Sequence, residues 1–222
     1  MVISICAATK LELEPIKKRL LNEPLTSHEV HFFVTGVGML QSCFHIQQHQ
    51  INTKPELIIL LGIAGSFNKD LTLGSAVIIE KEYLGSMGVQ ENNGNHKGWQ
   101  DIFDLGLQDP DQSPFKAKAL ENPWINNWPW IKEAKIPLVR SITIDEISSS
   151  KKRISQLAQH YQPALESMEG ASLHYCCLNY QTAFIQIRGI SNFVGERDKS
   201  NWQIGPALKA VTETAVDFLR HL

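Results

Sequence analysis

The sequence has 222 residues, of which 43% are hydrophobic and 20% are charged, and its formal net charge is −2. A chain of this size and composition can bury a full core without disulfides or a structural metal, and its near-neutral charge argues against nucleic acid or an anionic membrane as a partner. No apolar run approaches the ~20 residues of a membrane span, and no linker-like stretch divides the sequence, so we expect one domain over residues 1–222.

The first part of the chain alternates apolar runs with helical patterns. Continuous apolar character is typical of strands buried on both faces, and leucines and isoleucines at helical spacing indicate amphipathic helices. In chain order we expect a strand at 2–8, a helix at 11–21, a strand at 30–35, a helix at 39–50, and strands at 57–61 and 75–79.

The segment from about Gly85 to Trp130 interrupts this alternation. It is polar, contains clusters of Gly, Asn, Asp and Pro, and carries four of the five tryptophans. Long irregular segments inside compact domains tend to be functional loops or lids. We expect the Trp-rich part, residues 124–130, either to serve an interface between subunits or to cap the core of its own chain.

Regular patterns return after this segment. We expect a strand at 138–144, helices at 150–160 and from about Met168, a strand at 183–190, and a final helix with Pro206 in its first turn. Strands alternating with helices predict an α/β fold, a single domain with a central mixed, largely parallel twisted sheet flanked by helices. Ligands of such sheets bind beyond the carboxyl ends of strands, which places candidate site residues at 8–12, 36–38, 62–65, 145 and 190–195.

The cysteines and the N-terminus bear on the compartment. Cys6, Cys43, Cys176 and Cys177 form no C-x-x-C pair, and neighbouring cysteines are poorly placed to bridge each other, so we expect buried reduced thiols. The apolar start of the chain is too short for a secretion signal and lacks its basic flank. Together these features predict a cytoplasmic protein.

Common cofactor motifs are absent from the sequence. Gly36-Val-Gly38 lacks the third glycine of a dinucleotide fingerprint, since Gln41 stands in its place, and tight turns explain these glycines well. Gly62-Ile-Ala-Gly65 fits either a turn or a close approach of ligand to backbone. The chain has no P-loop, H-E-x-x-H or G-x-S-x-G motif, so we expect neither cofactor nor metal.

Two carboxylates stand out from the rest. Glu12 lies where the first strand meets the first helix, and Glu169 begins a later helix between Met168 and Gly170. A negative charge at the start of a helix interacts favourably with the helix dipole and stabilises the helix. The position of Glu12 therefore fits a structural role as well as a catalytic one. Asn192 follows a strand, where an amide that caps a turn is the ordinary interpretation.

Together these residues form a pattern similar to a known group. The elements are Ala8-Thr-Lys-Leu-Glu12, Thr35-Gly-Val-Gly38, Leu61-Gly-Ile-Ala-Gly65, Ser167-Met-Glu-Gly-Ala171 and Arg188-Gly-Ile-Ser-Asn192. The chain resembles the purine nucleoside phosphorylase/nucleosidase superfamily over nearly its whole length. Within that group it is similar to the methylthioadenosine/S-adenosylhomocysteine nucleosidases and, through Gly195-Glu-Arg-Asp-Lys199, most similar to the futalosine hydrolases of menaquinone biosynthesis.

The resemblance implies roles for residues at the centre of the site. Glu12 would be the base that activates water, Glu169 would accept a hydrogen bond from the ribose 2′-hydroxyl, and Met168 would pack against the sugar. Cleavage of an N-ribosidic bond requires such groups, because positive charge develops on the sugar and negative charge on the departing purine.

The same resemblance implies how the rest of the substrate is held. Asn192 would hydrogen-bond the purine, with Ser191, Gly65 and Ile147 around the base. Arg197, or Lys199 beside it, would pair with the benzoate carboxylate of futalosine, although a solvated loop explains these charges equally well. The group further implies a homo-oligomer in which a neighbour contributes to the site.

Two departures from the related groups bear on the reaction. The adenine-specific nucleosidases have an aspartic acid at the position of Asn192, whereas an amide offers both a donor and an acceptor and so suits the 6-oxopurine hypoxanthine. The phosphorylases bind phosphate with arginines near the first and third strands, where this chain has Glu12 and Ile63. We therefore expect hydrolysis of futalosine. The alternatives are an adenine-releasing nucleosidase and a catalytically silent nucleoside-binding protein.

Overall fold

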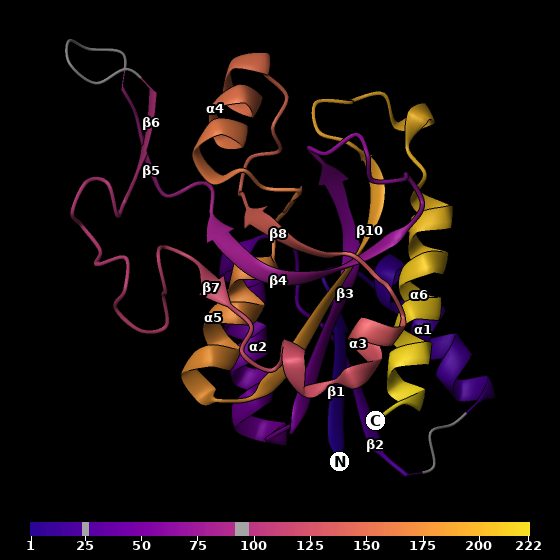
Figure 1. Ribbon diagram of the computed structural model, residues 1–222. Coiled ribbons are helices and arrows are strands. Elements are labelled where there is room, and N and C mark those ends of the chain that lie inside the picture. Colours follow the sequence, from indigo (N-terminus) through magenta and orange to yellow (C-terminus); the bar gives the residue numbers. More distant parts are fainter. Residues whose placement is uncertain (24–26, 92–97) are drawn as a thin grey trace.

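A computed structural model describes residues 1–23, 27–91 and 98–222 (Figure 1). One mixed sheet of eight strands runs through the molecule, in the order β10-β4-β8-β9-β3-β1-β2, with β7 paired to β4. The strands are β1 (Val2–Ala7), β2 (Glu29–Val34), β3 (Leu57–Ser66), β4 (Ala76–Leu84), β7 (Leu120–Glu121), β8 (Leu138–Thr143), β9 (Leu165–Ser167) and β10 (Ala183–Phe193).

This sheet closes on itself at one end. β10 pairs with β3 as well as with β4, so β3, β10, β4, β8 and β9 form a ring, and β1 and β2 extend the sheet beyond β3. Five pairings are parallel, and the contacts β3–β9, β4–β7 and β4–β10 are antiparallel. The predicted mixed, largely parallel sheet is confirmed, and its barrel-like closure is an addition to the prediction.

Helices cover both faces of the sheet. α1 and α6 pack against each other and against β1, β3 and β10 on one face, while α2 and α5 pack together on the other (Figure 1). The helices are α1 (Lys10–Asn22), α2 (Met39–Thr53), α3 (Pro129–Glu133), α4 (Lys151–Tyr161), α5 (Gly170–Tyr180) and α6 (Ile204–Arg220), with short 3-10 turns η1 (Ile125–Asn127) and η2 (Lys199–Asn201). No helix among the described residues is long and apolar enough to cross a membrane.

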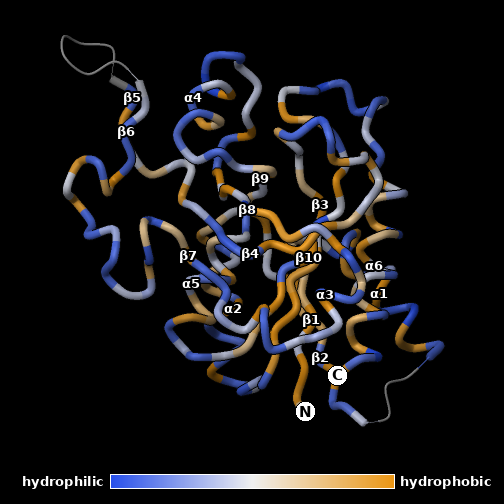
Figure 2. The backbone as a smooth tube through the Cα atoms, in the orientation of Figure 1, coloured by the Kyte–Doolittle hydropathy of each residue, from blue (hydrophilic) through white to orange (hydrophobic). Residues whose placement is uncertain are grey.

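The apolar core follows the strands. Hydrophobic residues concentrate on β1, β3 and β10 at the centre of the molecule, and polar residues occupy the outer loops and much of α4 (Figure 2). Ile5, Ile59 and Ile185 are fully buried on adjacent strands. Cys6, Cys176 and Cys177 are buried free thiols, as expected, whereas the free thiol of Cys43 is only half-buried.

The predicted ends of three strands are wrong. β4 continues beyond Ile79 to Leu84, where it pairs with β7 and β8. β3 continues beyond Leu61 to Ser66, and β10 continues beyond Ile190 to Phe193, because these two segments pair with each other in parallel. The glycines and polar residues in these two extensions indicate turns when the sequence is considered alone, but in the structure they are part of the sheet. The helix predicted from Met168 begins at Gly170, with Glu169 in the N-cap position.

The irregular middle segment contains structure of its own. A hairpin of β5 (Gly88–Glu91) and β6 (Gly98–Asp101) leaves the sheet, and β7, η1 and α3 follow. The rings of Trp128 and Trp130 both pack at 5.3 Å from the ring of Phe218 on α6. Of the two expectations for residues 124–130, the structure supports a cap on the core of the same chain.

Candidate active site

A cavity of about 290 Å³ lies beyond the carboxyl ends of β1, β3 and β10. Its size is close to the lower end of the range for small-molecule pockets. Seven of the eight residues predicted for the site line it, namely Glu12, Gly65, Ile147, Met168, Glu169, Ser191 and Asn192. The structure therefore brings these seven predicted residues together around one cavity.

A larger hollow of about 630 Å³ lies beside this cavity and shares Ile147 with it. Serines, Trp99 and Arg153 line it, and it contains none of the predicted catalytic side chains. The smaller cavity is the candidate active site, because the carboxylates and the amide needed for glycosidic chemistry converge there.

Glu12 is fixed at the start of α1. Its Oε2 accepts hydrogen bonds from the backbone N–H of Thr9 (3.1 Å) and from the hydroxyl of Thr9 (2.7 Å). The backbone N–H of Glu12 donates in return to Thr9 Oγ1 (3.3 Å), which completes a capping box. Its Oε1 accepts from the backbone N–H of Ile63 (3.1 Å) at the end of β3. Glu12 therefore both caps the helix and lines the cavity, and the first role holds the carboxylate rigid for the second.

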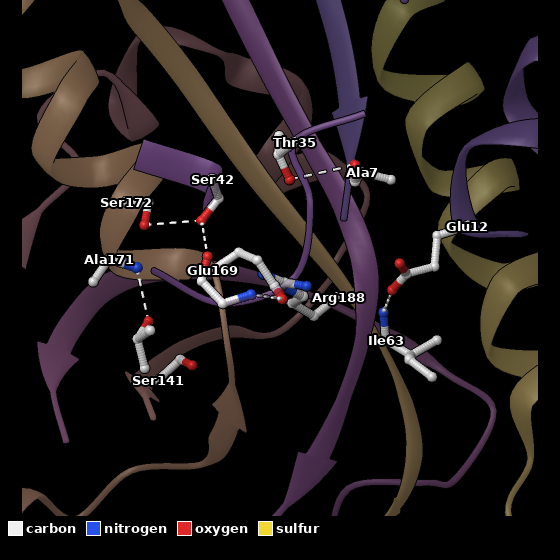
Figure 3. Close-up of polar contacts among 12 residues, drawn as sticks. Ala7, Glu12, Thr35, Ser42, Ile63, Ser141, Glu169, Ala171, Ser172 and Arg188 are labelled. Atoms are coloured by element: carbon white, nitrogen blue, oxygen red, sulfur yellow. Dashed lines mark hydrogen bonds and ion pairs between the residues drawn. The ribbon is translucent and has the colours of Figure 1, made fainter. Parts of the chain in front are cut away.

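Glu169 occupies the N-cap position of α5 but makes no capping bond with its side chain. Its Oε1 accepts instead from the N–H of Gly38 (3.2 Å), and its Oε2 from Arg188 Nη2 (3.4 Å) (Figure 3). Glu169 is 5% exposed. Burial raises the pKa of Glu169, and the Arg188 charge and the Gly38 N–H oppose that rise.

Arg188 lies between the two carboxylates. A Cβ atom at Gly62 would come within 2.3 Å of Arg188 Nη1 and 3.0 Å of Glu12 Oε1, so both groups reach the space over that glycine. A side chain at position 62 would collide with Arg188, so glycine is needed there for Arg188 and Glu12 to approach the strand this closely. Arg188 carries a full charge at 1% exposure, which is rare without a partner.

The turn at Gly36 and Gly38 has a structural basis. Both residues have positive φ, 81° and 86°, which favours glycine and agrees with the tight-turn interpretation. The turn also serves the site, because it aims the N–H of Gly38 at Glu169.

Asn192 also lines the cavity, and a break in β10 positions it. The pairing register with β3 shifts between Ile190 and Asn192, as in a β-bulge, which redirects the side chain. The hydroxyl of Ser191 donates to Asn192 Oδ1 (2.7 Å), and Asn192 Nδ2 donates to the carbonyl of Phe193 (3.0 Å). These contacts orient the amide and leave one N–H of Nδ2 for a ligand.

Arg197 is the one predicted site residue that does not line the cavity. Its guanidinium is exposed and lies 5.9 Å from the ring centre of Trp202, which does line the cavity. Pairing of Arg197 with a substrate carboxylate remains a prediction.

Sequence reasoning missed several lining residues and one buried partner. The lining residues outside the predicted strand-end ranges are Ile144, Glu166, Ser167, Trp202, Ile204 and Leu208, whereas Ala8, Thr9, Leu11, Val37, Ile63 and Ala64 lie within those ranges. Arg188 was quoted only as part of a motif, yet an arginine inside an otherwise apolar strand is a signal for a buried ion pair.

A cluster of possible metal ligands lies elsewhere. Asp101, Asp104 and His160 converge near the β5–β6 hairpin, and Lys118 Nζ lies 3.2 Å from Asp101 Oδ2. Burial raises the pKa of Asp101, but the hydrogen bond from His160 and the Lys118 charge outweigh it and lower this pKa to about 2. Lys118 already supplies the positive charge that the two carboxylates need.

Comparison with known proteins agrees with this geometry. Residues 9–222 match the model of the Phosphorylase superfamily. The chain belongs to this superfamily. It is 27% identical to a futalosine hydrolase of Thermus thermophilus, over 81% of this chain and 76% of that protein. It is 26% identical to a 5′-methylthioadenosine/S-adenosylhomocysteine nucleosidase of Bacillus cereus, over 78% of this chain and 71% of that one.

Solved structures from the phosphorylase superfamily share the fold. The futalosine hydrolase of Helicobacter pylori superimposes on this chain with a TM-score of 0.80 at 18% identity, over 100% of this chain and 98% of that chain. At this identity the likeness establishes the fold, and the activity has to be argued from the site.

Proposed function

We propose that this protein hydrolyses the N-glycosidic bond of futalosine and releases hypoxanthine and dehypoxanthine futalosine. The observation that carries the proposal is the arrangement of Glu12 and Glu169 around Arg188, with the oriented amide of Asn192 in the wall of the same cavity.

The carboxylates act on the sugar and on water. Glu12, held by Thr9 and Ile63, accepts a proton from a water molecule as the oxygen of that water attacks the anomeric carbon. Glu169 accepts a hydrogen bond from the ribose 2′-hydroxyl, and its charge stabilises the positive sugar in the transition state. Arg188 favours the ionised form of Glu169 that this role requires.

Asn192 acts on the departing base. The free N–H of its Nδ2 donates to the imidazole nitrogen or the 6-oxo group of the purine, where negative charge accumulates as the bond breaks. Ser191 fixes the amide for this contact. Met168 packs against the sugar, and Gly65 and Ile147 complete the base pocket.

The charge of the cavity supports water as the nucleophile. Among its described lining residues three are glutamates, Glu12, Glu166 and Glu169, and none is lysine or arginine. Inorganic phosphate in this cavity would be repelled by the carboxylates. Arg188 could not offset this repulsion, since it is already paired with Glu169.

Separate incubations with futalosine and with methylthioadenosine test the proposal. Chromatography of the free bases should find hypoxanthine from the first and little adenine from the second. Adenine release without hypoxanthine would contradict it and favour the second candidate, an adenine-releasing nucleosidase, which the similarity to the Bacillus cereus enzyme supports. Tight binding of inosine-like ligands without any product would indicate a silent nucleoside-binding protein instead.

The base preference is tested at one position. We expect Asn192→Asp to gain activity on adenine nucleosides, because a protonated acid donates to the imidazole nitrogen of adenine as it leaves. Unchanged preference would remove Asn192 from base selection.

We further propose that the protein acts as a homo-oligomer in the cytoplasm, in menaquinone biosynthesis. Leu40, Phe44 and Ile51 of α2 are 87%, 59% and 55% exposed, and Val37 just before them lines the cavity at 49% exposure. A second copy on this face would bury apolar surface and approach the site. The buried free thiols fit a reducing compartment.

A further inference from the structure

Glu166 belongs to the wall of the active-site cavity but has no part in the chemistry above. It lies on β9, where it pairs with Gly65 of β3 and with Ile142 of β8. A Cβ atom at Gly65 would lie 3.4 Å from Asn192 Nδ2 and 3.6 Å from Glu166 Cγ. Glu166 and Asn192 therefore border the same space, the end of the cavity assigned to the purine.

One oxygen of Glu166 lacks a partner. Its Oε1 accepts a hydrogen bond from the backbone N–H of Ser148 (3.3 Å), whereas its Oε2 is buried without a hydrogen bond to any described residue. The whole side chain is 6% exposed. A buried carboxylate oxygen left unpaired is costly, so a donor from a ligand is the natural way to satisfy it.

The two ends of a purine's six-membered ring differ in what they offer. A 6-oxopurine carries a donor at N1–H and acceptors at O6 and N7, whereas adenine carries an acceptor at N1 and donors at its 6-amino group. Asn192 supplies a donor and Glu166 an acceptor at this end of the cavity. That pair complements the 6-oxo form, and a carboxylate oxygen facing the lone pair at adenine N1 is repulsive.

We propose that Glu166 is a specificity-determining residue that accepts the hydrogen bond from N1–H of a 6-oxopurine base through its unpaired Oε2. The inference rests on the proposed function and deepens it, because it assigns base selection to two residues on the strands that flank β3. Glu166 selects by attraction to one base and repulsion of the other, which is how specific sites commonly work.

Burial and nearby charges act on the charge state of Glu166 in opposite directions. Burial raises the pKa of Glu166 to about 7, while hydrogen bonds from Ser148 and the charges of Arg153 and Arg197 oppose that rise. The charge of Arg197 thus lowers the pKa of Glu166, although Arg197 does not line the cavity. A donor at N1–H stabilises the ionised form further, so the base that fits also favours the charge state that binds it.

Substitution by glutamine gives a directional test. The N–H of Ser148 binds the side-chain oxygen, so Glu166→Gln turns an NH₂ group toward N1 of the base. The new donor opposes the N1–H of hypoxanthine and complements N1 of adenine. We expect kcat/KM for futalosine to fall by about 10- to 100-fold and that for its 6-amino analogue to rise. Glu166→Leu, which removes both oxygens, should lose the preference without gaining the second activity.

Glu146→Gln is the matched control, since it makes the same change at an exposed residue of the neighbouring loop and should leave both rates unchanged. Calorimetric dissociation constants for hypoxanthine and adenine should be measured on every variant alongside the rates. If the wild-type protein cleaves futalosine and Glu166→Gln keeps the wild-type preference, the inference is overturned and the proposed function stands. If the wild-type protein cleaves neither substrate but its hypoxanthine preference reverses in Glu166→Gln, the proposed function fails and the inference holds. Binding of neither base overturns both.

Discussion

Arg188 Nη2 lies 3.4 Å from Glu169 Oε2, and the two side chains form an ion pair that is almost completely removed from solvent. Taking two charges out of water is costly, and such a pair is rarely the most stabilising choice for a core. Its position between the two carboxylates proposed for catalysis gives it a functional reason, because the guanidinium opposes the rise in the pKa of Glu169 and fills the space over Gly62.

Replacing Arg188 by methionine should affect both activity and stability. The Glu169 carboxylate would stay buried without its partner, so its pKa would rise further and the activity profile would move to higher pH. We expect a loss of roughly 3–5 kcal/mol in the free energy of unfolding. Urea unfolding and a pH profile of kcat/KM measure the two effects.

Arg220→Met is the control for this prediction. Arg220 pairs with Glu23 at the surface, where both side chains are about half exposed. An exposed pair contributes about 0–1 kcal/mol, so equal losses in the two variants would show that the buried pair has no special role.

Glu12→Gln should abolish most of the turnover while the fold is retained. The amide oxygen can still accept from Ile63 or Thr9, but it cannot take a proton from water. We expect kcat to fall by ~100-fold or more. Glu14→Gln, an exposed change on the same helix, should leave kcat within twofold of the wild-type value; similar rates for both variants would remove Glu12 from the mechanism.

Ser191→Ala should loosen the amide of Asn192. The hydroxyl of Ser191 donates to Oδ1 at 2.7 Å, and without it the amide can rotate and present its oxygen to the base. We expect kcat/KM for futalosine to fall by about 10-fold, comparable to the loss of one hydrogen bond. Steady-state kinetics check this, and an unchanged kcat/KM would mean that the bond to Phe193 alone is enough.

Glu82 should make stability depend on pH. This side chain is fully buried, and burial raises its pKa from 4.5 to about 7. Because the folded state holds this proton more tightly than the unfolded chain, the contribution of Glu82 to stability is complete below pH 4.5 and is lost as pH rises through about 7. Between pH 5 and 8 the wild-type protein should therefore lose up to roughly 3 kcal/mol that Glu82→Gln does not lose.

Urea unfolding of both proteins at the two pH values measures this difference. Glu166 has a similar raised pKa, but it is present in both proteins and cancels in the comparison. An equal fall in stability for wild type and variant would contradict the assignment to Glu82.

Local patterns were sufficient to predict the sheet, most helices and most of the residues that meet at the candidate site. The runs around Ile5 and Ile59 are continuous in apolar residues because the strands are buried on both faces, and strand ends in such sheets carry the ligands. Glu12 and Asn192 stand at predicted strand ends, whereas the roles expected for them and for Glu169 come from the resemblance to the nucleosidases.

What the sequence did not reveal depends on contacts between distant segments. The extension of β3 to Ser66 requires β10 as a partner, and the closure of the barrel requires the antiparallel pairing of Gly65 with Glu166. Arg188 and Glu166 acquire their roles only when those strands meet. The charge of Arg188 inside an apolar strand predicts that it has a partner, but neither this pattern nor the position of Glu166 identifies the residue that each one meets.

The central claim is that this protein hydrolyses futalosine in the cavity described above. The most direct test incubates the purified protein with futalosine, with and without inorganic phosphate, and quantifies the free hypoxanthine. We expect hypoxanthine and dehypoxanthine futalosine in equal amounts, at the same rate in both buffers, and only background release from Glu12→Gln. No hypoxanthine, or release that requires phosphate and yields a sugar phosphate, would contradict the account.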